Sequence, residues 1–409
     1  MLRLWPAERA AIRPPEDLTL SQWAERFRVL DENASEAGPW RNERTPYLLD
    51  IMDALTDSSI EEITCIKATQ MGLTEAALNW LGYIVDQDPG PTLIVYPRKE
   101  DCEYMSDARL QRMLEVNPQI SKHMTRRKRD QRKFLYRFDR ATVYFGAATS
   151  PADLASKSIR YLILDELDRY DRWLPGEGNP LDIVLQRART FWNRKIFKFS
   201  SPTTPEGNIW REWLKSDRRR RWCQCPKCHI YQPLKWDQVK WPKDMREPER
   251  IKNALLAAYK CEHCGHLIED GLDGTARDKF LRSGVWAQEG AVVHPDGRVT
   301  GTKKTLHAGF HVSGLYSPWT TWSALAAKWV TIQKQAESLQ VFINTELAEP
   351  WEEKVVERTE SDLRRLILPY MSGTVPDGAV ALTAGIDVQA DHYYFVVRAW
   401  SEKLESWLV

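Results

Sequence analysis

Between residues 62 and 201, short runs of β-branched and aromatic residues alternate with segments of helical period. The apolar runs are ITCIKA, TLIVYP, ATVYFGA, RYLILDE and KIFKFSS, and the segments TEAALNWLGYIV and DARLQRML between them have helical spacing. Strands that alternate with helices are typical of parallel sheets. The pattern therefore predicts an α/β domain with a largely parallel sheet.

The pattern changes on both sides of this core, which we assign to residues 56–216. Residues 1–55 are polar with Pro-containing breaks, and we expect a lead-in arm there. Residues 217–320 are rich in Cys, Gly and Trp and predict an inserted subdomain. Helical periodicity returns in 321–375, which ends in a linker, and 376–409 has the pattern of a hairpin that begins another β-rich unit.

Composition limits the class of protein. Hydrophobic residues make up 43% of the chain, and 58 Lys and Arg nearly balance 57 Asp and Glu, which excludes a disordered polyelectrolyte and a uniformly basic nucleic-acid coat. No signal-like or membrane-spanning apolar run occurs, so we expect a soluble cytoplasmic protein without membrane contact. The basic runs 126–129 and 218–221 fit either phosphate contact or a solvated charged face.

A loop that resembles a phosphate-binding loop follows the first predicted strand. Its sequence, KATQMGLT, runs from Lys67 to Thr74 with Gln70 at its centre. Gly72 and Thr74 match the pattern G-x-x-x-x-G-K-[ST], but Lys67 stands at the first Gly and Leu73 replaces the lysine. Lys67 could still reach phosphates, and the Thr74 hydroxyl would bind Mg²⁺. By itself the motif fits an ordinary strand-to-helix turn equally well.

Two later strand ends strengthen the nucleotide interpretation. The apolar strand LIL ends in Asp165 and Glu166, which suit a Mg²⁺ ligand and a group that polarises the attacking water. The next strand ends in SSPTT, where Ser200, Ser201 and Thr203 could sense the γ-phosphate. Together these motifs predict ATP hydrolysis with Mg²⁺, although a surface acidic turn and an ordinary Ser/Pro turn are the plainer alternatives.

Four of the seven cysteines have metal-ligand spacing. Cys225 and Cys228 form one C-x-x-C pair, and Cys261 and Cys264 form another. Paired knuckles of this kind hold one tetrahedral Zn²⁺ through four thiolates, and such a closed site is structural. Reduced packing cysteines are the alternative, and nearby histidines are possible substitute ligands.

Two further residues are weaker candidates. Tyr47, upstream of the first strand, could stack on adenine, but a surface aromatic is equally compatible. Asp387 ends the β-like run ALTAGI and could bind metal in a two-metal nuclease site, although one aspartate at a strand end is little evidence.

Taken together, these residues resemble the GpA family of phage terminase large subunits. The segments that carry the resemblance, in family order, are GPWRNERTPYLLDIMDAL, IKATQMGLTEAALNWLGYIV, ASKSIRYLILDELDRY, KFSSPTTPEG, CPKC with CEHC, SGLYSPWTTW, FINTELAEPWEE and LTAGIDVQADHYYFVVRAW. The resemblance implies a P-loop ATPase sheet of the RecA/ASCE-like kind, an inserted zinc-ribbon-like subdomain and the first hairpin of an RNase H-like nuclease domain.

The implied function is an ATP-driven motor that packages double-stranded DNA into a procapsid, with a family endonuclease that cuts the DNA. The implied partners are a small terminase subunit, the portal and further copies of the chain. By position, Lys67 resembles the family's displaced phosphate lysine, Tyr47 its adenine-contacting aromatic and Asp387 its first nuclease aspartate. Because the chain ends 22 residues after Asp387, we expect a C-terminally truncated, incomplete nuclease, as in a fragment, a decayed prophage gene or half of a split protein.

Two other functions stay open at this point. A superfamily 2-like helicase or translocase shares these ATPase motifs, but it would need a second RecA-like domain, and none is evident after residue 217. A non-enzymatic zinc-ribbon DNA-binding adaptor with a degenerate nucleotide fold is compatible with Leu73 at the usual lysine position.

Overall fold

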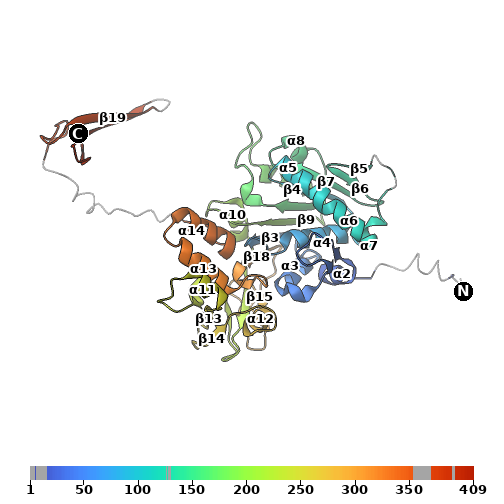
Figure 1. Cartoon of the computed structure of the whole chain (residues 1–409). Coiled ribbons are helices and arrows are strands. Elements are labelled where there is room, and N and C mark those ends of the chain that lie inside the picture. Colours follow the sequence, from blue (N-terminus) through green and yellow to red (C-terminus); the bar gives the residue numbers. More distant parts are fainter. Residues whose placement is uncertain (1–4, 6–15, 126, 128–129, 353–369, 389–391) are drawn as a thin grey trace. The chain divides into compact units, whose positions relative to one another are not determined.

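The computed structural model describes the chain except for residues 1–4, 6–15, 126, 128–129, 353–369 and 389–391 (Figure 1). The chain forms two compact units, Met1–Glu352 and Glu353–Val409. The predicted sites at 47–264 all lie in the first unit, and Asp387 lies in the second. Among the described residues, no helix combines the length and the apolar character needed to cross a bilayer.

The first unit is built on an 11-stranded sheet whose central strands are parallel. In spatial order the strands are β11 (Tyr231–Pro233), β10 (Arg219–Gln224), β18 (His307–Val312), β3 (Glu62–Lys67), β9 (Lys195–Ser200), β8 (Tyr161–Asp165), β4 (Pro91–Tyr96), β7 (Thr142–Ala147), β6 (Leu135–Arg137) and β5 (Gln131–Arg132), with β15 (Val285–Ala287) beside β10. The five strands predicted from the apolar runs are all present, so the α/β prediction is confirmed.

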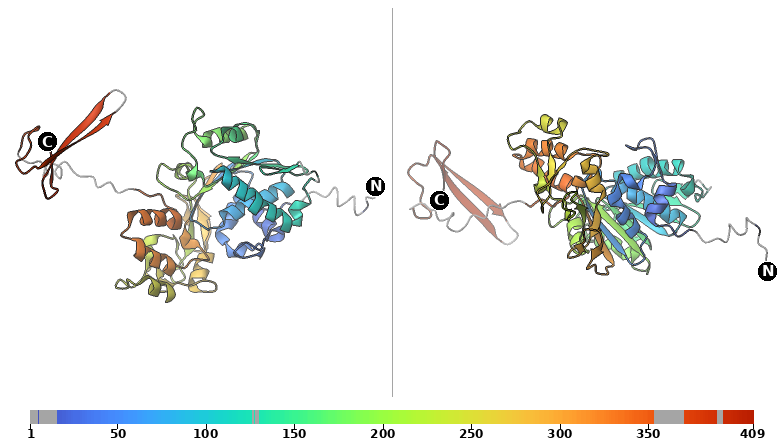
Figure 2. Two further views of the ribbon diagram at one scale, coloured as in Figure 1. Left: turned by 45° about the horizontal axis from the view of Figure 1, so that its top comes forward. Right: turned by 90° about the horizontal axis from the view of Figure 1, so that it is seen from below.

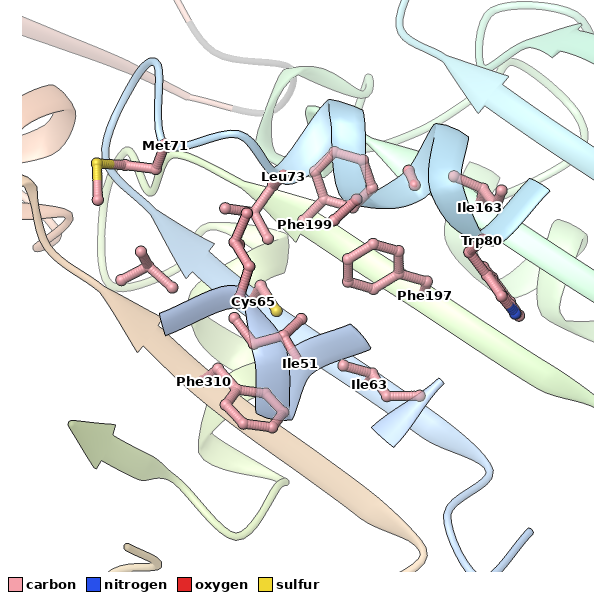
Figure 3. Close-up of a cluster of buried hydrophobic side chains, with 14 of the residues drawn as sticks. Ile51, Ile63, Cys65, Met71, Leu73, Trp80, Ile163, Phe197, Phe199 and Phe310 are labelled. Carbon is pink, nitrogen blue, oxygen red and sulfur yellow. The ribbon is translucent and has the colours of Figure 1, made fainter. Parts of the chain in front are cut away.

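Helices cover this sheet. Those before residue 217 are α2 (Leu20–Phe27), α3 (Leu49–Ala54), α4 (Leu73–Asp86), α5 (Lys99–Tyr104), α6 (Arg112–Val116), α7 (Pro118–Ser121), α8 (Pro151–Ala155), α9 (Pro180–Leu185) and α10 (Asn208–Leu214). The longest, α4, lies across the central strands (Figure 3). Its Trp80 packs edge-on against Phe197 of β9, with ring centroids 6.3 Å apart. This packing fixes the direction of α4, and its first turn lies at the carboxyl ends of the strands.

Residues 20–55, which were expected in a lead-in arm, belong to the core of the first unit. Leu20 and Trp23 of α2 are fully buried. The indole nitrogen of Trp23 donates a hydrogen bond of 2.9 Å to Asp86 Oδ2 at the end of α4. The polar residues of this segment mark the exposed side of α2 and the loop that follows it, including the short β1 (Val29–Leu30) and β2 (Gly38–Pro39).

The segment predicted as an insertion, 217–320, contributes to the main sheet at both ends. Near its start β10 pairs in parallel with β18, and β18 pairs in parallel with β3. Between them lie β12 (Val239–Lys240), β13 (Ala258–Lys260), β14 (Leu267–Glu269), β16 (Val292–Val293), β17 (Val299–Thr300), α11 (Pro248–Asn253) and α12 (Ala276–Arg282). The helices α13 (Trp322–Ile332) and α14 (Ala336–Phe342) follow, and α13 packs on α11 and β13 (Figure 2).

The arginine run 218–221 is tied into the fold. Arg218 pairs with Glu289, and Arg219 donates to Asp217 Oδ2 at 2.8 Å. The Arg220 guanidinium lies 5.6 Å from the Trp213 ring centre, and Arg221 is 2% exposed. These contacts hold Arg219, Arg220 and Arg221 against neighbouring residues, while the Arg218 side chain is 38% exposed. Most of the other run, 126–129, lies outside the described residues.

The second unit contains the predicted hairpin. Strand β19 (Ala381–Val388) pairs antiparallel with β20 (Tyr393–Trp400), and β20 pairs with β21 (Ser406–Leu408). Asp387 faces Tyr394 across the hairpin. The hairpin at this position is confirmed, and β19 is exposed along its whole length.

Candidate functional site

Three neighbouring parallel strands end side by side and each carries a predicted site residue. Lys67 is the last residue of β3, Ser200 the last of β9 and Asp165 the last of β8. The register pairs Ile66 with Ser200 and Asp165 with Phe199, so the three strand ends are level. Carboxyl ends of parallel strands are where α/β folds place ligand sites, and here the sheet order itself brings residues about 100 positions apart together.

The displaced lysine points at the acidic pair. Lys67 Nζ lies 2.7 Å from Glu166 Oε1, and the lysine side chain is only 8% exposed. Glu166 has φ 50°, a left-handed backbone conformation that non-glycine residues adopt rarely and chiefly at functional sites. Its second carboxylate oxygen accepts a hydrogen bond of 3.4 Å from the Ser200 hydroxyl. The three strand ends thus share one polar cluster.

Asp165 has the features of a metal ligand. Its Oδ2 accepts a hydrogen bond of 3.4 Å from the Thr74 hydroxyl, while its buried Oδ1 has no partner. Burial raises the pKa of Asp165 to about 7, Lys67 opposes the rise and the charge of Glu166 adds to it. A carboxylate with a free buried oxygen beside a threonine hydroxyl fits Mg²⁺, which prefers oxygen ligands. These two residues would hold the ion, and the ion would supply charge neutralisation for phosphate groups.

Two backbone hydrogen bonds join the β3–α4 loop to residues far downstream in the chain. Ala68 N donates to Val312 O, and Thr69 N donates to Thr345 O, each at 2.8 Å. Gln70 and Gly72 have φ of 57° and 75°, so two residues of the loop adopt the left-handed backbone conformation before α4 begins. A Cβ on Gly72 would strain that turn and lie 3.2 Å from Leu48 Cδ1. The loop geometry therefore depends on glycine at 72.

The burial of position 73 explains why a leucine stands where the common phosphate-loop pattern has a lysine. Its side chain is 1% exposed and lies in the apolar cluster under α4, among residues that include Cys65 and Phe199 (Figure 3). A lysine ammonium at this position would be buried among apolar groups without a partner, which is costly. Lys67 places an ammonium group at the adjacent strand ends, 2.7 Å from Glu166 Oε1, so Leu73 does not by itself argue for a degenerate site.

A cavity of about 810 Å³ opens beside the loop. Residues 69–72 form one side, and the segment around residues 30–45 and Trp319 form others. Thr45 lines the cavity, and its hydroxyl is buried with no hydrogen-bond partner. Trp319 is 37% exposed, and its indole nitrogen donates to Glu36 Oε1 at 2.8 Å. The Arg44 guanidinium lies 5.7 Å from the centre of the Trp319 ring, so the cavity beside the predicted phosphate site has an aromatic residue and an arginine in its wall.

Tyr47 occupies a different place from the one expected of an adenine-stacking residue. Its side chain is 2% exposed, and its hydroxyl donates to Met71 O at 3.2 Å. Trp286 Nε1 donates to the backbone oxygen of Tyr47 at 3.1 Å. Tyr47 is not among the residues that line the large cavity. The buried Tyr47 side chain thus supports the β3–α4 loop through its hydrogen bond to Met71.

The four predicted zinc ligands come together. Their sulfur atoms all lie within 4.8 Å of one another, with Cys225 and Cys264 at 3.7 Å and Cys228 and Cys261 at 3.8 Å. A tetrahedron with metal–sulfur bonds of about 2.3 Å has edges of about 3.8 Å, so the cluster fits zinc. Cys223 is not part of the cluster.

The two cysteine knuckles have matching backbones. One pair lies in the β10–β11 turn and the other in the β13–β14 turn. The residue four positions after the first cysteine is left-handed in both, His229 with φ 58° and Gly265 with φ 70°. Burial raises the pKa of Cys225 and of Cys228, whereas hydrogen bonds from the backbone N–H groups of Cys264 and His263 and from neighbouring thiols lower the pKa of Cys261. The four thiols therefore ionise as one interacting group.

Comparison with known proteins identifies the family. Residues 34–286 match the family model described as phage terminase large subunit gpA, ATPase domain, and residues 307–409 match the terminase large subunit gpA endonuclease domain. The chain belongs to the gpA family of phage terminase large subunits. The endonuclease model begins at β18, inside the main sheet, so this boundary differs from the division between the two compact units.

Individual relatives agree with this assignment. The chain is 27% identical to the terminase large subunit of Escherichia phage lambda, over 98% of this chain and 64% of the lambda protein. It is 26% identical to that of Enterobacteria phage P21, over 97% of this chain and 62% of that protein. The chain thus spans less than two thirds of either relative. Among solved structures, the HK97 bacteriophage large terminase is similar with a TM-score of 0.44 and 14% identity, over 96% of this chain and 66% of that one.

Three residues of this gpA-family chain that lie around the site were not predicted from the sequence: Asp168, Asn344 and Trp319. Asp168 accepts a hydrogen bond from the Thr203 hydroxyl, Asn344 donates one to the Thr203 backbone oxygen, and Trp319 lines the cavity. Signals for them existed: Asp168 follows Glu166 by two positions, and the other two lie in segments that resemble the family. For none of the three does the position in the sequence indicate which residue it contacts in the fold.

Proposed function

We propose that the first unit binds ATP with Mg²⁺ at the carboxyl ends of β3, β9 and β8 and hydrolyses it to drive double-stranded DNA into a procapsid. The observation that carries the proposal is the convergence of Lys67, Glu166, Asp165 and Thr74 from separate segments onto one partly buried cluster. Charged and hydroxyl groups in this arrangement match those that phosphoryl transfer requires.

Each of these residues has a distinct role in the proposal. Thr74 and Asp165 hold the ion, and Lys67 neutralises negative charge on the phosphates. Glu166 orients and polarises the attacking water. In the present structure Lys67 pairs with Glu166, so arriving phosphates compete for the lysine and release the glutamate carboxylate for its water. The ion pair would thereby restrain hydrolysis chemistry until nucleotide is in place.

The nucleoside part of ATP is proposed to occupy the cavity beside the loop. The cavity is large enough, since ligand pockets are typically about 300 to 1,000 Å³. Trp319 and Arg44 both line the cavity, with the Arg44 guanidinium 5.7 Å from the Trp319 ring centre, and they provide an aromatic and a cationic contact for a base or ribose. Tyr47, which the resemblance suggested for adenine, would then act indirectly by holding Met71 and the loop.

Besides ATP and Mg²⁺, the proposal includes a structural Zn²⁺ bound by Cys225, Cys228, Cys261 and Cys264. The ion would join the β10–β11 turn to the β13–β14 turn. Since β10 pairs with β18 in the main sheet, the zinc would fasten the small sheet to the ATPase core. A closed four-sulfur shell leaves no open position for catalysis.

Membership of the gpA family supports the partners that we propose. They are double-stranded DNA, a small terminase subunit, the portal of the procapsid and further copies of this chain. The direct test is ATP turnover by the purified chain with and without double-stranded DNA, with Glu166→Gln as the inactive control.

A further inference from the structure

Asp168 has an unusually complete set of hydrogen bonds near the proposed catalytic glutamate. It lies on the short helix η5 (Leu167–Arg169), two residues after Glu166. Its Oδ2 accepts from Thr203 N at 2.7 Å and from the Thr203 hydroxyl at 2.8 Å. Its Oδ1 accepts from Ile209 N at 2.6 Å. The carboxylate therefore ties the turn that carries Glu166 to the segment that follows β9.

The surroundings of Asp168 are shaped to receive its carboxylate. A Cβ on Gly207 would lie 2.3 Å from Asp168 Oδ2, so a residue with a side chain there would displace the carboxylate. The backbone N–H of Asp168 itself donates to the Ser200 hydroxyl at 3.2 Å. Ser200 also contacts Glu166, so the ends of β8 and β9 and the start of α10 are held in one network.

Thr203 continues this network away from the site. Its backbone oxygen accepts from Asn344 Nδ2 at 2.6 Å and from Trp351 N at 2.9 Å. Every polar atom of Thr203 is therefore engaged, with Asp168 on one side and the 344–351 segment on the other. That segment begins in the π-helical turn η9 (Ile343–Leu347), whose Thr345 oxygen also binds Thr69 of the β3–α4 loop. Single π turns in helices are frequent at functional sites.

We propose that Asp168 is a positioning residue that sets the direction of Glu166 and transmits nucleotide state through Thr203 to residues 344–351. This inference rests on the proposed ATPase function. Residues 344–351 contact both the loop beside the phosphates and the segment after β9, so a movement of either would reach them. Asp168 touches no reacting atom in this account. It acts by holding Thr203 and the Glu166 turn in fixed relation.

The test compares Asp168→Asn with a pair of variants at Thr203 in the full chain. Asparagine keeps the shape of aspartate but has one acceptor oxygen, so it cannot satisfy the donors at both carboxylate oxygens. Thr203→Val removes only the hydroxyl, and Thr203→Ser retains it. Thr203 is exposed, so neither substitution should disturb the core.

We expect Asp168→Asn to lower kcat for ATP by about tenfold to a hundredfold, because a small displacement of a catalytic group has effects of this size. The KM for ATP and the melting temperature should stay close to those of the parent. Thr203→Val should lower kcat in the same direction, Thr203→Ser should restore it, and the double variant Asp168→Asn with Thr203→Val should lose less than the product of the two single losses.

The outcomes separate this inference from the proposed function. An active parent whose Asp168→Asn and Thr203→Val variants both keep parental kcat overturns the inference alone. A loss of turnover that Thr203→Ser shares equally with Thr203→Val overturns it as well, because the hydroxyl would then have no part. A folded parent that neither binds nor hydrolyses ATP overturns the proposed function and, with it, this inference.

Discussion

Lys67→Ala is expected to lower ATP turnover by a factor on the order of 10² to 10³, the usual loss when a charge-stabilising group is removed from a catalytic site. Lys67, the last residue of β3, is the one lysine in the segment 67–74, and its ammonium lies 2.7 Å from Glu166 Oε1. Without it, the cation left beside Glu166 is Arg169, whose Nε lies 3.6 Å from Glu166 Oε2, and the pKa of Asp165 should rise further because Lys67 no longer opposes the effect of burial. Steady-state phosphate release at neutral pH measures the effect.

Lys122→Ala is the matched control for that substitution. Lys122 pairs with Asp86 at the far end of α4 and is half exposed, so removing it deletes a lysine without touching the strand ends. The control should retain parental turnover. If Lys67→Ala also hydrolyses ATP like the parent, the assignment of the displaced lysine to phosphate is wrong, and another cation must serve the site.

Loss of zinc is expected to be the largest single effect on stability. Structural zinc sites contribute roughly 10 to 16 kcal/mol of apparent binding free energy in small zinc-finger peptides, and part of that free energy supports folding. Protein purified without chelators should hold one zinc per chain, whereas Cys264→Ser should hold none. Chelation should expose residues 225–264 to protease before the central strands, because those strands are held by α4 and the sheet. Metal analysis and limited proteolysis test the two parts separately.

Cys223→Ala provides the control for the zinc experiment. Cys223 is fully buried on β10 but is not one of the four clustered cysteines. Its replacement should lower stability modestly, as small core truncations do, and leave the zinc content unchanged. Full zinc and parental stability in Cys264→Ser, or absence of metal from the parent, would contradict the zinc assignment.

The central strands could be predicted from the sequence because each is a continuous apolar run. Fully buried parallel strands have this appearance, and β8 and β9 are buried at every position. The sequence also placed Lys67, Asp165 and Ser200 at strand ends. Since those ends share one edge in a parallel sheet, their proximity follows from the fold class. The cysteine cluster was predictable for a different reason, because metal ligands have characteristic spacing.

The outer parts of the sheet could not be predicted in the same way. Strand β10 begins with consecutive arginines, and a basic run looks solvent-exposed until Asp217, Glu289 and neighbouring aromatic rings are known to surround it. Strand β18 pairs with β3 from about 240 residues away. Nothing local in either strand records that pairing. For the same reason residues 20–55 appeared to be an arm, since the burial of Trp23 depends on α4.

The side-chain contacts around the site could not be predicted from local sequence patterns either. Tyr47 was assigned by its place in a motif, but its environment is set by Met71 and Trp286. Asp168 looked like one more acidic residue after a strand. Its carboxylate accepts hydrogen bonds from Thr203 and Ile209, which lie 35 and 41 residues downstream. Side-chain positions of this kind require the tertiary structure.

The central claim is that this chain couples ATP hydrolysis at the β3, β9 and β8 strand ends to double-stranded DNA. The most direct measurement is phosphate release by the purified chain with increasing linear duplex DNA, for the parent and for Glu166→Gln in parallel. We expect the parent to hydrolyse ATP faster with DNA, and Glu166→Gln to be stabilised by ATP with Mg²⁺ yet show no turnover. Turnover that persists in Glu166→Gln, or a folded parent that neither binds nor hydrolyses ATP with DNA present, would contradict the claim.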